Sequence, residues 1–318
     1  MTTLVDDNLV GAPDAYQTPS VRPSLAEAQA WCKHLATTHY ENFHVATMFL
    51  PARLRPHFHS LYAFCRTSDD LGDEVADTAT ATRLLTQWRA MLHECFENSE
   101  ASRHPVFVAL QPSIVQCRLP REPFDDLVSA FEQDQFVTHH PNIESLERYS
   151  RCSANPVGRL VLLAAGYRSP ESMALSDDIC TALQLANFYQ DVAEDDERGR
   201  RYLPGDCMAR FGVTDAQIHE LRFDQNFRSM MKFLVEDARA RLVRGERIVK
   251  LVDRDLAATL SLFAKGGHAI LDAIVAQDYN TLQSRPVVTK FAKLRLLLGA
   301  MIGKAAAMLL PATQKVRA

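Results

Sequence analysis

The sequence predicts an all-α protein, and three observations indicate this class. Glycine is scarce, with 12 residues in a chain of 318, and the prolines lie mostly between segments of helical periodicity. No run of alternating apolar and polar residues is bounded by hairpin turns, as half-buried strands require. With 47% hydrophobic residues, the chain is long enough for one large core or for two fused helical halves.

The helices are expected to follow a polar segment, residues 1–23, which carries three prolines and is interpreted as a flexible tail. Ser24 and Glu27 have the spacing of a capping box, which predicts a helix from there to Leu50, and Pro51 ends it. Further helices are predicted over 54–77, 79–98, 104–118, 121–138, 143–166, 171–197, 214–222, 227–252, 254–283 and 287–310. In 227–252 the apolar stripe has a gap near Gly245. One folded domain is expected over 24–311, followed by a tail over 312–318.

The composition restricts the compartment and the partners. A formal net charge of -4 gives no general attraction to polyanions, so nucleic acid is not an expected partner. Seven scattered cysteines without a C-x-x-C pair indicate a reducing cytoplasm and no disulfide framework. No stretch reaches the roughly 18 uncharged apolar residues of a membrane span. The best candidate, 294–310, is interrupted by Arg295 and Lys304, which is typical of a packed or interfacial helix.

The predicted helix 54–77 carries an acidic stripe. A step of roughly 100° per residue brings five polar side chains within an arc of about 80°. They are Tyr62, Arg66, Asp69, Asp73 and Asp77. Like charges four positions apart repel and cost a few tenths of a kcal/mol, so this stacking is unfavourable unless a cation offsets it.

A second stripe lies in the predicted helix 171–197, where Gln184, Asn187, Asp191 and Asp195 share one face. Its apolar neighbours favour a polar cavity over open solvent. Either stripe alone is more typical of a solvated helix face, because charge runs usually are. Two stripes of hard oxygen ligands, without alternating His or Cys, suit Mg²⁺ and through it a diphosphate group. The basic turn that follows, Arg198 to Pro204, either caps the helix or contacts phosphate.

These motifs resemble the squalene/phytoene synthase family, the head-to-head prenyl synthases. The first motif reads Tyr62-Ala-Phe-Cys-Arg66 and continues into Asp69-Asp70-Leu-Gly-Asp73-Glu74. The second reads Gln184-Leu-Ala-Asn187, continues into Asp191-Val-Ala-Glu-Asp195 and ends in Gly199-Arg-Arg-Tyr-Leu-Pro204. Each motif alone is moderately specific, and both together, 122 positions apart (191 minus 69), are strong. The similarity runs from about Ser24 to Leu298.

The resemblance implies an all-α isoprenoid synthase fold, a helical bundle whose two aspartate-rich helices face each other across a central cavity. It implies two or three Mg²⁺ ions, an isoprenoid diphosphate substrate and no NADPH. The implied catalytic residues are Asp69, Asp73, Asp191 and Asp195, which with Asn187 are also the implied metal ligands. The implied substrate or diphosphate contacts are His39, Asn42, Tyr62, Arg66, Tyr149, Gln184, Asn187, Gln190, Arg200 and Tyr202.

Within the family, two segments resemble the branch that converts presqualene diphosphate and water into hydroxysqualene and diphosphate in hopanoid synthesis. They are His39-Tyr-Glu-Asn-Phe43 and Arg151-Cys-Ser-Ala-Asn-Pro-Val-Gly158. The implied activity is that of a carbon–oxygen lyase acting on a diphosphate. The implied partners are peripheral membrane contact at the inner face and the upstream and downstream enzymes of that route. One departure is Gln190, because most of the family has arginine just before the second motif's first aspartate.

A carbocation left by departing diphosphate needs apolar walls with π-faces, and Phe43, Phe188 and Tyr189 are candidates to line the cavity. Ordinary core packing is the alternative for all three. Three histidines, of which His39 adjoins a matched motif, are candidate acids or bases, although such histidines are mostly structural: His39, His139 and His140.

Several alternative functions stay open. The chain is also compatible with a presqualene diphosphate, squalene, dehydrosqualene or phytoene synthase of the same family. A head-to-tail chain-elongating prenyltransferase would also use Asp69-Asp70-x-x-Asp73, but paired arginines after that motif and an aspartate pair opening the second are missing. A non-catalytic helical scaffold is disfavoured by intact acids at every matched position. The sequence shows no Gly-rich dinucleotide-binding fingerprint after a strand. A Rossmann-type reductase is therefore not indicated.

Overall fold

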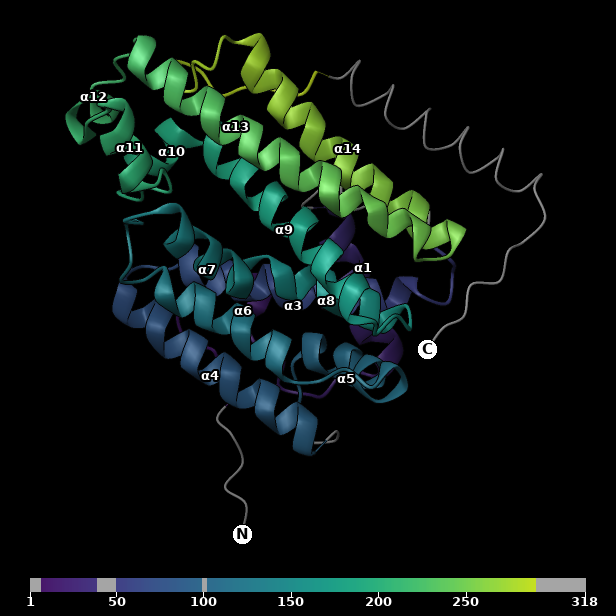
Figure 1. Ribbon diagram of the computed structural model, residues 1–318. Helices are drawn as coiled ribbons and strands as arrows, with labels where there is room; N and C mark the ends of the chain where they lie inside the picture. The colour runs from purple at the N-terminus through teal and green to yellow at the C-terminus, as the bar shows by residue number, and fades with distance from the viewer. Residues whose placement is uncertain (1–6, 39–49, 99–101, 290–318) are drawn as a thin grey trace. The chain divides into compact units, whose positions relative to one another are not determined.

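The computed structural model describes residues 7–38, 50–98 and 102–289. Within these ranges the regular elements are helices, and the one extended pairing is an isolated bridge between His139 and Arg201. The helices form two compact units (Figure 1). Unit 1 consists of the described parts of 1–136 and 156–168, and unit 2 of those of 137–155 and 169–316. The predicted all-α class is confirmed.

Unit 1 is built around one long helix, α3 (Arg55–Asp73), which carries the first acidic stripe. The other helices are α1 (Leu25–Thr38), α4 (Thr78–Glu97), α5 (Pro105–Cys117), α6 (Glu122–Gln133) and, apart from its first residue, α8 (Asn155–Ala164). Helix α3 packs against α1, α4, α5 and α6. The predicted capping box is confirmed, since the Glu27 amide donates to Ser24 Oγ (3.3 Å) and the Ser24 amide to Glu27 Oε2 (2.8 Å).

Residues 7–23 are ordered against unit 1, which corrects the prediction of a flexible tail for this part of the chain. The side chains of Leu9 and Tyr16 are 0% and 4% exposed, and a short 3-10 helix, Asp14–Tyr16, holds the second of them. Asp7 pairs with the guanidinium group of Arg103. A few apolar anchors and one ion pair are enough to fix a segment whose average composition is polar.

Unit 2 is dominated by three helices that lie side by side in Figure 1: α9 (Pro170–Gln190), α13 (Gln225–Gly245) and α14 (Arg254–Ala276). Around them are α7 (Ile143–Ser153), α10 (Val192–Glu197), α11 (Gly205–Phe211), α12 (Asp215–His219) and the 3-10 helix η2 (Glu246–Lys250). Helix α14 is long and apolar enough to cross a membrane by length and composition, with 33% of its apolar window buried. The sequence analysis did not single it out.

Two predicted helices are broken, and others end early, among them 54–77 at Asp73 and 121–138 at Gln133. The prediction 143–166 is wrong at Ala154, because Pro156 has no N–H with which to continue the hydrogen bonding of α7. The prediction 171–197 is wrong at Asp191, where α9 ends. The helix predicted over 254–283 ends at Ala276. Most of 287–310, including the apolar candidate 294–310, lies outside the described residues, as does 39–49 of the first predicted helix.

Replacing Gly245 by alanine should destabilise unit 2. An added Cβ would lie 2.5 Å from Ile179 Cγ1 and 2.8 Å from the Leu175 carbonyl oxygen, so α9 and α13 would have to separate. Alanine gains about 1 kcal/mol of helix propensity, but overpacking against backbone costs roughly 1–3 kcal/mol or more. Denaturant unfolding should therefore show a net loss. The control is Gly266→Ala in α14, where an added Cβ meets nothing within 4 Å and stability should rise.

The stability of unit 1 should fall in mild acid through His104. Burial lowers the pKa of this imidazole from 6.5 to about 4, while Nε2–H donates to the Tyr16 carbonyl (3.2 Å) and Nδ1 accepts from the Val106 amide (3.2 Å). The unfolded chain takes up this proton below about 6.5 and the folded chain does not. The stabilisation is therefore complete above that pH and is lost as the pH falls towards 4, by about 3 kcal/mol in total.

The measurement is urea unfolding across this pH range for the wild type and for His104→Asn, which keeps an N-cap acceptor for α5. The variant should be less stable at every pH but should show a shallower slope between 6.5 and 4. Equal slopes in the two proteins would contradict the assignment of this slope to His104.

Candidate active site

The C-terminal part of α3 presents the first acidic stripe. Tyr62, Arg66 and Asp69 are partly exposed and Asp73 is exposed, whereas the residues between them are mostly buried. Asp77 does not belong to the stripe, which corrects the sequence prediction. Helix α3 ends at Asp73, and the Asp77 carboxylate instead accepts from the Thr80 amide (2.8 Å) as the N-cap of α4.

The guanidinium group of Arg66 is fixed beside the stripe by a buried carboxylate. Nε and Nη2 donate to the two oxygens of Asp70 at 3.0 and 2.6 Å, and Nη1 lies 3.7 Å from Asp69 Oδ2. The hydroxyl group of Tyr16 also donates to Asp70, and burial raises its pKa, so it stays protonated. Asp70 and Tyr16 are thus positioning residues for Arg66. Tyr16 is 54 positions away from Asp70, and no sequence spacing points to it.

In unit 2 the second stripe keeps its spacing although the helix is interrupted. Asp191 is the C-cap of α9, with φ -104° and ψ 18°, and α10 begins at the next residue. The Asp191 amide donates to the Asn187 carbonyl (2.9 Å), and the Asp195 amide donates to the Asp191 carbonyl (2.8 Å). Asn187, Asp191 and Asp195 therefore still follow one another at one-turn intervals. All three, with Gln184, are partly exposed.

A cation from a distant part of the chain contacts this stripe. Arg285 donates from Nε to Asp191 Oδ1 (2.6 Å) and from Nη2 to Oδ2 (3.1 Å), a bidentate pair, and Nε lies 3.4 Å from Glu194 Oε2. Buried Gln190 joins the same group: its amide donates to the Pro286 carbonyl (2.5 Å), and its oxygen accepts from Arg285 Nη2 (3.5 Å). The sequence analysis missed Arg285, which lies 94 positions beyond Asp191 without a recognised motif.

Asp195 is a partly buried carboxylate with a second carboxylate close by. Burial raises its pKa most, and the neighbouring Asp191 charge adds to this, so the pKa reaches about 7. Arg198 and Arg200 act in the opposite direction, which places the predicted phosphate contact Arg200 within electrostatic reach of this group. Arg201 pairs instead with Asp196 (2.7 Å) and Asp215. A divalent cation would relieve the repulsion between Asp191 and Asp195.

Four aromatic rings come together in unit 2, three of them at predicted site positions. Phe188 and Tyr202 stack with centroids 3.9 Å apart and planes 5° apart, and Tyr149 and His140 pack on Tyr202 at 5.9 and 5.7 Å. All four are buried. One face of Phe188 is therefore covered by Tyr202. Tyr189 is fully buried in the unit 2 core, where burial raises its pKa, as the core-packing alternative expects.

The remaining residues that the sequence predicted for the site contribute less to the described candidate site. His39, Asn42 and Phe43 lie outside the described residues. His139 is exposed, and its backbone forms the bridge to Arg201. His140 is buried in the aromatic cluster, and burial lowers its pKa, so it is neutral near pH 7.

The oxygen donors fit a hard divalent cation in their chemistry. Among the described residues no three His, Cys, Asp or Glu side chains form a cluster that would hold a metal alone. Mg²⁺ does not require such a cluster, because it binds through one or two carboxylates together with waters and substrate phosphates. Each stripe offers two carboxylates one turn apart: Asp69 with Asp73, and Asp191 with Asp195.

Helical units that carry aspartate stripes flanked by fixed arginines are the arrangement that the resemblance to isoprenoid synthases implied. Residues 36–292 match the family model described as squalene/phytoene synthase. The chain belongs to this family. Its fold is the all-α isoprenoid synthase fold, and the members of the family are isoprenoid synthases.

Among solved structures, squalene synthase HpnC from Alicyclobacillus acidocaldarius is 42% identical, with a TM-score of 0.76, over 80% of this chain and 96% of that chain. A dehydrosqualene synthase in complex with ligand, 24% identical with a TM-score of 0.79, covers 89% of this chain and 98% of its own and shares the fold. The 15-cis-phytoene synthase of Synechocystis sp. is 28% identical over 88% of this chain and 86% of its own length. Phytoene synthase 2 of Solanum lycopersicum is 28% identical over 86% of this chain and 89% of its own.

Proposed function

We propose that this protein is a hydroxysqualene synthase, which ionises presqualene diphosphate and captures the carbocation with water. The observation that carries the proposal is the matched pair of acidic stripes. Each has two aspartates one turn apart and an arginine on the first of them, Arg66 beside Asp69 and Arg285 on Asp191. We further propose that the two stripes face each other and share the diphosphate.

In the proposed reaction, the carbon–oxygen bond to the diphosphate breaks, and both bonding electrons leave with the diphosphate. Arg66 and Arg285 donate hydrogen bonds to its oxygens, and Arg200 adds a third cation. Bound Mg²⁺, held by Asp69, Asp73, Asp191, Asp195 and the Asn187 amide oxygen, would supply Lewis-acid stabilisation of this leaving group. The resulting cyclopropylcarbinyl cation rearranges, as the electron pair of a ring bond moves to the cationic carbon and the three-membered ring opens. Water then adds an oxygen lone pair to the rearranged cation and loses a proton to solvent, which gives hydroxysqualene.

The ion pairs within each stripe have a function in this scheme. Before substrate binds, Arg285 offsets the charge of Asp191, which would otherwise repel both its neighbour Asp195 and an incoming diphosphate. A cation fixed in this way needs little reorganisation to receive the developing charge, and such preorganisation is usually the largest single catalytic contribution. Tyr62 and Gln184, which are partly exposed on the same stripes, are proposed to contact the substrate.

The choice of substrate rests on two supports. The identity to the squalene synthase from Alicyclobacillus acidocaldarius is 42%, against 28% to the phytoene synthases of Synechocystis and tomato, which favours a C30 over a C40 route. Gln190, buried and neutral where most of the family has arginine, suits one diphosphate intermediate better than two prenyl diphosphates. Membrane contact and contacts with neighbouring enzymes stay predictions.

Product analysis tests the proposal. Purified protein with Mg²⁺ should release hydroxysqualene and diphosphate from presqualene diphosphate equally well with and without NADPH. Squalene formed only when NADPH is present would identify a reductive synthase. Phytoene from geranylgeranyl diphosphate, or presqualene diphosphate as the end product from farnesyl diphosphate, would identify the other branches and contradict the proposal.

A further inference from the structure

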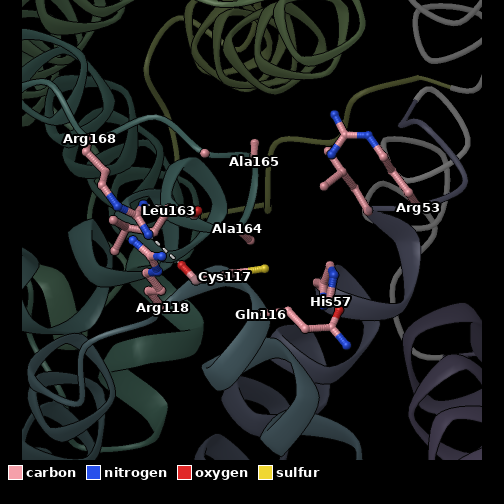
Figure 2. A pocket seen from close by; sticks show the side chains of 11 residues that line it. Arg53, His57, Gln116, Cys117, Arg118, Leu163, Ala164, Ala165 and Arg168 are labelled. Carbon is pink, nitrogen blue, oxygen red and sulfur yellow. Dashed lines mark hydrogen bonds between the residues drawn. The ribbon is translucent and has the colours of Figure 1, made fainter. Parts of the chain in front are cut away.

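Unit 1 contains a cavity of about 550 Å³ at the opposite end of α3 from its aspartates (Figure 2). Its walls come from the segment before α3 and its first turn, from the end of α5, and from the end of α8 with the turn that follows. Arg55 and Asp73, the two ends of α3, are roughly 27 Å apart at 1.5 Å per residue. The cavity is therefore separate from the acidic stripe on this helix.

The charged side chains that line this cavity are all cationic. Arg53, Arg118 and Arg168 reach it from three different segments, His57 lies on the side of Arg53, and no aspartate or glutamate is among the described residues that line it. Arg168 is anchored, because Nη2 donates to the Cys117 carbonyl (2.5 Å) and Nη1 to the Leu163 carbonyl (3.4 Å). Figure 2 shows Arg168 and Arg118 together on one side and Arg53 on the other.

The helix ends do not cancel this charge. The C-termini of α5 and α8 contribute about half a negative charge each, which accounts for part of the attraction of Arg118 and Arg168. The N-terminus of α3 contributes about half a positive charge and has no side-chain cap. Three guanidinium groups, which are always protonated, therefore leave an excess of about two and a half positive charges.

The effect of these charges on neighbouring groups agrees with this count. Burial lowers the pKa of the His57 imidazole first, and the charge of Arg53 lowers it further. Burial raises the pKa of the Cys117 thiol, and Arg168 and Arg53 both act against that rise. Both guanidinium groups are thus within electrostatic reach of one thiol, from opposite sides of the cavity.

We propose that this cavity binds a phosphate group, either of a free phosphate anion or of an anionic lipid headgroup. A carboxylate carries one charge and is matched by one guanidinium group, whereas a tetrahedral phosphate offers several acceptor oxygens and up to two charges to donors on different sides. Leu163, Ala164 and Ala165 give the cavity an apolar wall beside the cations. This wall would accommodate the start of a lipid chain.

The test compares wild type with Arg53→Gln/Arg118→Gln, which removes the two arginines that, among the described residues, donate to no backbone carbonyl. The matched control is Arg148→Gln/Arg222→Gln, which removes the same charge from exposed ion pairs in unit 2. Inorganic phosphate is titrated by calorimetry at constant ionic strength, with a chelator present to suppress metal-dependent binding at the aspartates. Wild type and control should bind alike, and the pocket variant should bind at least tenfold more weakly, about 1.4 kcal/mol.

A second arm separates the two sources of phosphate. Cosedimentation is measured with phosphatidylcholine vesicles that contain or lack phosphatidylglycerol. Binding of the phosphatidylglycerol vesicles that is lost in the pocket variant and kept in the control supports a lipid headgroup. Calorimetric phosphate binding without vesicle binding supports a free anion. Wild type that binds neither probe, or a pocket variant that matches wild type in both arms, overturns the proposal. If the double variant does not fold, Arg118→Gln alone decides in the same way.

Discussion

Replacing Asp69 or Asp191 by asparagine is expected to abolish diphosphate release, with kcat/KM falling roughly a hundred- to a thousandfold or more. Each substitution removes a charge that is proposed to hold Mg²⁺ but keeps the shape of the side chain. The fold should survive. Asp69 is 45% exposed and Asp191 pairs with an arginine that is 45% exposed, and such pairs contribute less than about 1 kcal/mol to stability. Released diphosphate and the thermal unfolding midpoint are measured together.

The control is Asp272→Asn in the same unit as Asp191. Asp272 also pairs with an arginine, Arg239 at 2.7 Å, and should lose as little stability while keeping full activity. Product formation near the wild-type rate by either Asp69→Asn or Asp191→Asn would count against the proposed function. The same result would favour the non-catalytic scaffold, which does not need these charges.

Helical periodicity predicted most helices of the two units and the order of residues along each stripe. In the second half of α3 the partly exposed positions are Tyr62, Cys65, Arg66 and Asp69, which recur at three- to four-residue steps as a rotation of 100° per residue requires. This worked because a helix face that avoids the core must repeat in the sequence. The family resemblance, carried by the same residues, added the fold and the diphosphate chemistry, and the match over residues 36–292 confirms the family.

What the sequence did not predict depends on contacts between distant residues. The pair of Tyr16 with Asp70 and that of Arg285 with Asp191 join positions 54 and 94 residues apart, and neither leaves a periodic signal. Local chemistry explains the other errors. Asp77 continues the stripe in projection, but an aspartate with extended backbone is also a strong N-cap, and capping α4 is the role it takes.

Arg285 and Gln190 lead to the second large prediction. Most of the family has arginine at the position of Gln190, and here Arg285 brings a guanidinium group to the same Asp191 from further along the chain. If that cation is the shared requirement, Arg285→Gln should lower kcat/KM roughly tenfold to a hundredfold, the value of a charge-assisted hydrogen bond. Gln190→Arg should also weaken the enzyme, because it buries a second positive charge beside Arg285 and replaces the amide that donates to the Pro286 carbonyl by a longer side chain.

The double variant Gln190→Arg/Arg285→Gln tests whether activity needs a guanidinium group at position 285 itself or only one guanidinium group beside Asp191. It restores a single guanidinium group next to Asp191, so it should be more active than either single variant, and the double-mutant cycle should show a coupling well above 0.5 kcal/mol. Losses that simply add would mean that Arg285 and Gln190 act independently. In that case the arginine on Asp191 would be a surface ion pair, and the cation that receives the diphosphate in unit 2 would have to be sought at Arg200, whose charge also acts on Asp195.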